Sequence, residues 1–208
     1  MVLFLIGLVF ADLLASPGFP AYDASVSRIA QFFDGNRTEA LGLSFCHCFA
    51  ALALLVFAAH LRSVLRERGG DDDAATLAFA GGAIAAGFLL LSALLYWVLT
   101  RSEVATEPGT AEATLLLSYM AGGPAILIPA VPLLAVTSIV GARAGFIPLW
   151  LMRLGFAGAA ISLLSPIGLL WDDAFALMLV GALLFFVWLF ATSVVLVRRE
   201  QAAGPTAS

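Results

Sequence analysis

The sequence has 208 residues and no lysine; all ten of its Lys/Arg positions are arginine. Without lysine the chain cannot form the Schiff base that holds retinal or pyridoxal phosphate, so both chemistries are excluded. The lysine of a phosphate-binding P-loop is absent too, which excludes a P-loop ATPase. No lysine beside abundant alanine is typical of a GC-rich bacterial genome.

Charged residues are also scarce. They make up 12% of the chain, against about 25% in a soluble domain, while hydrophobic residues make up 62%. So few polar side chains cannot coat a water-facing globule. The apolar side chains are therefore expected to face lipid or each other.

What the chain has instead is long apolar blocks. Five of the six reach the roughly 20 residues that a helix needs to cross the hydrocarbon core. The sequence predicts an all-α polytopic transmembrane bundle of six spans, forming a single domain over residues 1–200, with a disordered tail at 201–208. The blocks cover residues 2–15, 40–61, 74–99, 111–140, 146–170 and 174–197.

The short first block is interpreted as a membrane span. It lacks the positively charged start of a signal peptide, and Asp12 interrupts its apolar run. A cleaved signal, which would leave five spans, is the alternative.

Arginine is unevenly distributed between the loops. Under the positive-inside rule the arginine-rich side is cytoplasmic, which predicts a plasma-membrane protein with both termini in the cytoplasm. The outer side is then acidic, which disfavours nucleic acid as a partner. The seven arginines assigned to the inner side are Arg62, Arg66, Arg68, Arg143, Arg153, Arg198 and Arg199.

The outer loop after the first block contains one amphipathic segment. Val26, Ile29, Ala30 and Phe33 recur at helical spacing and form an apolar stripe. This predicts a short helix that lies on the membrane surface or covers the bundle.

Small residues recur at intervals of four in two of the predicted spans. Ala78, Gly82 and Ala86 form one such row, and the pairs Gly155/Ala159 and Gly158/Ser162 form two more. Rows of this kind let helix backbones approach closely, so they predict packing and indicate no activity.

Cys46-His47-Cys48 is the first candidate for chemistry. Residues two apart on a helix point about 200° apart, so the two cysteines cannot close on one ion. The histidines His47 and His60 are 13 residues apart on one predicted helix, about 20 Å along its axis. They cannot be the two axial ligands of one haem. His47 is the remaining candidate for cofactor binding, and no cofactor or metal is predicted.

The fourth block carries the most suggestive pattern, because Gly122-Gly123-Pro124 and then Pro129 and Pro132 interrupt it. Broken helices near the midplane often line transporter sites, where freed carbonyls meet a substrate. A proline kink stabilised by neighbouring helices is the structural alternative. Ser118 in the same block is a further pathway candidate. Arg153 is another, since it lies inside a span, where snorkelling to the surface is the alternative.

The first third of the chain resembles a recurring, largely uncharacterised class of multi-pass membrane proteins from actinobacteria. The resemblance rests on Asp23-Ala24-Ser25, Ile29-Ala30, Phe33 and Asn36-Arg37-Thr38, followed by an apolar span that ends in Leu61-Arg62. It implies a polytopic membrane fold of about six spans and transfers no catalytic residue.

No catalytic set is evident, so the sequence favours a non-enzymatic integral membrane protein. Small-molecule transport or partner binding is the leading hypothesis. A haem- or redox-linked protein using His47 and an accessory subunit of a membrane complex are the alternatives. The expected partners are the lipid bilayer and either a second copy or a membrane complex.

Overall fold

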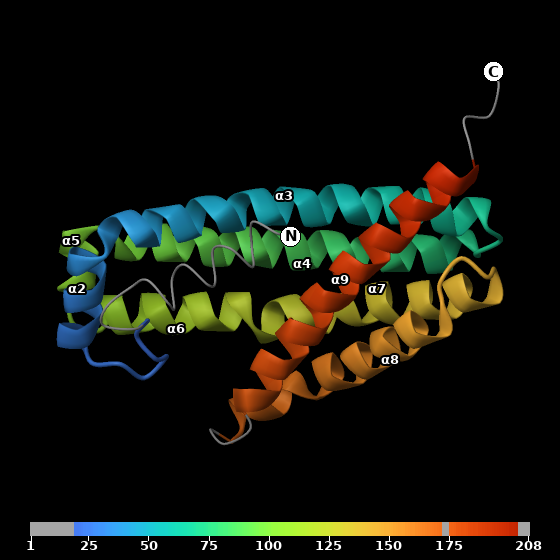
Figure 1. Ribbon diagram of the computed structural model, residues 1–208. Coiled ribbons are helices and arrows are strands. Elements are labelled where there is room, and N and C mark those ends of the chain that lie inside the picture. The colour runs from blue at the N-terminus through green and yellow to red at the C-terminus, as the bar shows by residue number, and fades with distance from the viewer. Residues whose placement is uncertain (1–18, 172–174, 204–208) are drawn as a thin grey trace. The chain divides into compact units, whose positions relative to one another are not determined.

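A computed structural model describes residues 19–171 and 175–203, and every regular element in these ranges is helical (Figure 1). The all-α prediction is confirmed for this part of the chain. The described elements are α2 (Val26–Gly35), α3 (Arg37–Glu67), α4 (Asp72–Leu99), α5 (Ser102–Ala105), α6 (Thr110–Gly122), α7 (Pro124–Arg143), α8 (Leu149–Leu164), the 3₁₀ helix η1 (Ser165–Leu169) and α9 (Phe175–Ala203).

Within the described ranges, five stretches are long and apolar enough to cross a membrane. Only 33–44% of the residues in their most apolar windows are buried inside the protein. The remaining apolar surface needs a nonaqueous surrounding, as expected of an integral membrane protein. The stretches are Arg37–Glu67, Asp72–Leu99, Thr110–Arg143, Leu149–Gly168 and Leu177–Arg199.

The predicted first span, 2–15, lies outside the described residues. Helix α9 continues through Gln201–Ala203, which the sequence assigns to a tail, and residues 204–208 are again outside the described ranges. The chain divides into two compact units, the first formed by Met1–Ala53 with Ala86–Ile126 and the second by Leu54–Ala85 with Leu127–Ser208.

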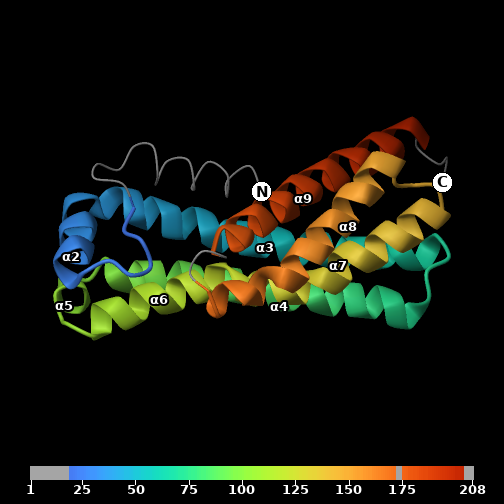
Figure 2. The same ribbon diagram turned by 90° about the horizontal axis from the view of Figure 1, so that it is seen from below.

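In the first unit, α2 packs against α5 and α6, and Figure 2 shows these three helices next to one another. Ile29, Phe32 and Phe33 of α2 are buried in a core that they share with Leu99 and Leu115. A helix is therefore present at the predicted place in the chain, and its apolar stripe packs on protein. Its location on the outer side of the membrane stays a prediction. Ala30 of that stripe is only partly buried, whereas Phe32, which was not part of the stripe, is fully buried.

In the second unit, α8 and α9 form an antiparallel pair (Figure 1). Gly155 of α8 lies near Trp188 of α9, whereas Gly158, about one turn later on α8, lies near Leu184. The two helices therefore run in opposite directions. Both glycines and Ala159 are buried at this contact. The predicted small-residue row on α8 is thus confirmed as a packing surface.

Glycines also bring α4 close to its neighbours in the second unit. A Cβ on Gly82 would lie 2.6 Å from Cβ of Ala58 on α3, a distance that no real pair of such atoms adopts. Ala78 in the same row is buried in this unit, and Ala86, which belongs to the first unit, is buried as well. The second predicted small-residue row is confirmed as well.

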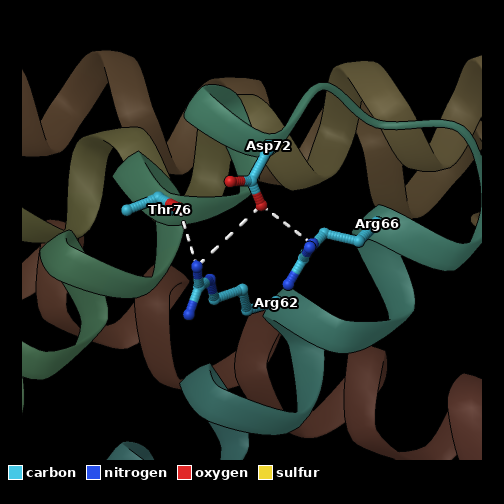
Figure 3. Close-up of polar contacts among 4 residues, drawn as sticks. All are labelled: Arg62, Arg66, Asp72 and Thr76. Atoms are coloured by element: carbon cyan, nitrogen blue, oxygen red, sulfur yellow. Dashed lines mark hydrogen bonds and ion pairs between the residues drawn. The ribbon is translucent and has the colours of Figure 1, made fainter.

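The turn between α3 and α4 is fixed by polar contacts (Figure 3). Oδ1 of Asp72 forms an ion pair with Nε of Arg66 at 2.8 Å and lies 3.9 Å from Nη2 of Arg62. Arg62 also donates a hydrogen bond to the Thr76 hydroxyl at 3.1 Å. Gly69, at φ +87°, supplies the left-handed residue on which the turn depends. The acidic start of α4 thus neutralises part of the basic end of α3.

Candidate functional site

The fourth predicted span is interrupted at Gly123. This residue has φ −107° and ψ −106°, outside the helical region, so α6 ends at Gly122 and α7 begins at Pro124. Both Gly123 and Pro124 are buried. The break predicted from the glycine–proline pattern is therefore a real interruption of the helix.

Two further prolines lie inside α7, at Pro129 and Pro132. Proline has no N–H to give to the carbonyl four residues earlier, so Ala125 and Ile128 lose that helical hydrogen bond. Helix α4 packs directly on this segment, because a Cβ on Gly81 would collide with the carbonyl oxygen of Pro129 and lie 2.8 Å from Cγ of Pro132. The proline segment is thus covered by α4 within the second unit.

Ser118 belongs to a small hydroxyl cluster in the first unit. Its side chain donates to the carbonyl of Leu115 at 2.6 Å. Its own carbonyl accepts a 3.0 Å hydrogen bond from Ser92 on α4. The hydroxyl of Tyr96 interacts with both serines. The cluster is satisfied by its own members, as expected of a structural link between α4 and α6.

His47 is buried in the first unit, and its Nδ1 lies 2.9 Å from the carbonyl of Leu43. Its ring contacts Tyr96, with 6.1 Å between the ring centroids. Cys46 and Cys48 on either side are free thiols. In the described ranges no three or more His, Cys, Asp or Glu side chains come together in a way that could hold a metal ion.

Arg153 is exposed near the start of α8, five residues after the Pro148 that precedes the helix. It makes no hydrogen bond, ion pair or ring contact with another described residue. The candidates from the sequence are therefore dispersed. Ser118 and His47 share Tyr96 as a neighbour, whereas the prolines of α7 and Arg153 join no common cluster.

A different group of polar residues stands out in the second unit. Five side chains are fully buried, and their polar atoms have no hydrogen-bond partner among the described residues. We call this group the polar seam. Its members are Thr137 and Ser138 of α7, Ser162 of α8, and Trp188 and Thr192 of α9.

Gly155 lies at the centre of the polar seam. A Cβ on this residue would collide with the hydroxyl of Ser138 and lie 2.6 Å from the indole nitrogen of Trp188. Helices α7, α8 and α9 thus approach one another closely at Gly155, which has no side chain. Thr192 lies one turn beyond Trp188 on the same face of α9, because residues four apart are neighbours on a helix.

The polar seam has a definite extent along the helices. Ser162 lies seven residues from Gly155, about 10 Å at a rise of 1.5 Å per residue. Thr192 lies about 6 Å from Trp188 in the opposite direction along the antiparallel pair. The seam therefore covers about 16 Å, roughly half of the 30 Å hydrocarbon thickness.

Buried polar groups without partners are costly, above all where lipid excludes water. They are therefore rare, and each one points to strain, to function or to a bound group. Every member of the polar seam is electrically neutral. Hydroxyls can both donate and accept a hydrogen bond, and the indole N–H can only donate. The hydrogen-bonding groups of the seam therefore match those of a small neutral polar solute.

Sequence reasoning overlooked most of these residues. Ser162 was assigned to packing, and Thr137, Ser138, Trp188 and Thr192 were not singled out. A usable signal was present in the sequence, because Trp188 lies in the middle of an apolar block, away from the span ends where tryptophan is typical.

Comparisons with models of protein families, with curated proteins and with solved structures found no match. The resemblance to an actinobacterial class stays a prediction.

Proposed function

We propose that the protein is a non-enzymatic, multi-pass protein of the bacterial plasma membrane that moves a small neutral polar solute across the bilayer. One observation carries this proposal: the five polar side chains of the seam, from three helices, are buried without a hydrogen-bond partner in the described part of the chain. The helical architecture and the five apolar stretches support the membrane setting.

The chemistry of the seam selects the class of solute. None of its five side chains carries a charge, so an ion would leave water without a counter-charge, at a cost far above that of a neutral solute. Hydrogen-bonding groups distributed over about 16 Å along the helices offer successive partners to such a solute. Urea, glycerol and water are suitable probes of this class.

Proteoliposomes containing the purified full-length protein test the proposal. Stopped-flow light scattering measures how quickly urea, glycerol and water equilibrate after an osmotic step. We expect faster equilibration of at least one probe than in protein-free liposomes. We also expect this gain to fall in the Thr137→Val/Ser162→Ala/Thr192→Val variant. Ser193→Ala is the matched control, because Ser193 already donates a hydrogen bond to the carbonyl of Leu189 at 2.8 Å. Rates equal to those of empty liposomes for all three probes would disprove transport of this class.

The proposed orientation has its own test. Both termini are placed in the cytoplasm on the basis of the arginine distribution. A reporter fused after Ser208 is expected to be active only on the cytoplasmic side, and one inserted at Glu107 between α5 and α6 only outside. The opposite pair of results would invert the orientation without changing the membrane assignment.

A further inference from the structure

The second unit has a cavity of about 490 Å³ where the α3–α4 turn meets the end of α7. This volume falls within the range of sites that bind small molecules. One wall comes from the turn and includes Arg68 and Asp71, and the other comes from α7 and includes Arg143. The turn residues Arg68–Asp71 that line it lie in the chain between Arg66 and Asp72, whose ion pair is drawn in Figure 3.

The α7 wall combines apolar and basic character. Val136, Ile139, Val140 and Arg143 line the cavity at positions i, i+3, i+4 and i+7, so they share one face of the helix. Gly70 fits the turn against this wall, since a Cβ there would lie 3.3 Å from Val140 Cγ1. The apolar side chains of Val136, Ile139 and Val140, called here the apolar strip, therefore share a helix face with the guanidinium group of Arg143.

The two arginines of the cavity are available for a ligand. Arg66 is held by Asp72 at 2.8 Å, and Arg199 donates to the carbonyl of Gly145 at 2.7 Å. Arg68 and Arg143, by contrast, are exposed and make no hydrogen bond or ion pair with any residue in the described part of the chain. Asp71 contributes one negative charge, so the charged residues that line the cavity sum to one positive charge.

This combination matches one chemical class of ligand. Guanidinium groups bind phosphate oxygens through paired hydrogen bonds, and basic pockets at the cytoplasmic ends of spans accept the headgroups of anionic lipids. A soluble phosphate would use the arginines and leave the apolar strip uncovered. A phospholipid would cover both, with its acyl chain along Ile139 and its phosphate at Arg143. We propose that this cavity binds the phosphodiester headgroup of an anionic phospholipid through Arg68 and Arg143.

The test uses the full-length protein in nanodiscs of phosphatidylcholine, with or without phosphatidylglycerol. The readouts are the Tm and the lipid retained in native mass spectrometry. We expect phosphatidylglycerol to raise the Tm of the wild type, and we expect the R68Q/R143Q variant to bind it about thirtyfold more weakly. Arg198→Gln is the control for the loss of a single positive charge, since it changes an exposed arginine that does not line the cavity. It should bind as the wild type does.

Several outcomes would overturn the proposal. Equal Tm values of the wild type in the two lipid mixtures would do so, as would a preference for phosphatidylglycerol that survives in R68Q/R143Q. Inorganic phosphate or glycerol phosphate bound as tightly as the lipid would assign the cavity to a soluble ligand instead. If the double variant fails to fold, the single variants R68Q and R143Q replace it, each with an expected loss of about fivefold.

Discussion

The hydroxyl of Ser138 on α7 and the indole nitrogen of Trp188 on α9 meet at the same point, the place where Gly155 of α8 lacks a Cβ. Both side chains are fully buried, and neither polar atom has a hydrogen-bond partner among the described residues. Close packing and unmet hydrogen bonding thus coincide at one position. This coincidence separates the polar seam from the satisfied hydroxyl cluster around Ser118 in the first unit.

Substitution of Gly155 by alanine is expected to destabilise the protein by about 1–3 kcal/mol, because the added methyl group overpacks a filled contact. Thermal unfolding in detergent measures the effect. Gly87→Ala in α4 is the matched control, since nothing lies within 4 Å of a Cβ there, and alanine at an open helical position stabilises by up to about 1 kcal/mol. Equal Tm changes in the two variants would contradict the packing described at Gly155.

The hydroxyls of the seam and those of the first unit should respond oppositely to removal. Thr192→Val keeps the shape and removes an unpartnered polar atom, so we expect unchanged or higher stability. Ser92→Ala breaks a hydrogen bond to the carbonyl of Ser118 and should cost about 0.6 kcal/mol, as is typical of such bonds in membranes. The Tm values of the two variants measure this difference in stability. A larger decrease in Tm for Thr192→Val than for Ser92→Ala would show that the Thr192 hydroxyl has a hydrogen-bond partner.

Trp188→Phe should lower solute flux. The substitution keeps an aromatic ring in the buried position and removes the N–H that no described residue accepts. If that donor binds the passing solute, loss of about 1 kcal/mol corresponds to a roughly fivefold slower flux. Proteoliposome flux, compared at equal protein content, provides the measurement. A flux that stays at the wild-type level would remove the indole from the pathway.

The prolines of α7 allow a related experiment. Alanine at Pro129 or Pro132 supplies the N–H that restores a hydrogen bond to the carbonyl of Ala125 or Ile128. If these carbonyls take part in passage, each variant should become more stable and conduct about fivefold less. Pro166→Ala is the control, because Pro166 lies at the start of η1, where a proline costs little. If the alanine variants become more stable but keep the wild-type flux, the two prolines have a structural role only.

Asp72→Asn tests the turn between α3 and α4. The partners Arg66 and Asp72 are 55% and 60% exposed, so their ion pair should contribute only about 0.2–1 kcal/mol. The decrease in Tm should shrink in high salt, because exposed charges are screened. Asp73→Asn, which removes the neighbouring charge from the same helix start, serves as the comparison. A salt-independent decrease would mean that the hydrogen-bond geometry matters more than the charge.

The sequence could predict the helices because length and hydropathy alone decide what crosses lipid. It also predicted the break at Gly123 and the glycine contacts of α4 and α8, since small residues at regular spacing have one main structural use. The ends of the helices were less accurate. Helix α3 continues six residues beyond the apolar block that ends at Leu61, because Arg62 and Arg66 are satisfied by Asp72 across the turn.

The polar seam could not be predicted in the same way. A serine or threonine in a membrane helix normally binds a carbonyl of its own helix, as Ser44 does with Ala40. The sequence does not tell which hydroxyls lack this hydrogen bond to a carbonyl of their own helix. That depends on which helices meet, and the meeting of α7, α8 and α9 at Gly155 is a property of the folded chain.

The first unit carries one further consequence, for the order of assembly. The hydroxyl of Tyr119 donates a 2.8 Å hydrogen bond to the carbonyl of Pro20, 99 residues earlier, and Phe19 beside it contacts both Tyr96 and Tyr119. During synthesis the Phe19–Pro20 segment leaves the ribosome long before these tyrosines exist. Until α4 and α6 have been synthesised, the aromatic partners that Phe19 can reach are Phe32 and Phe33 of α2, and the contacts with the two tyrosines must form later.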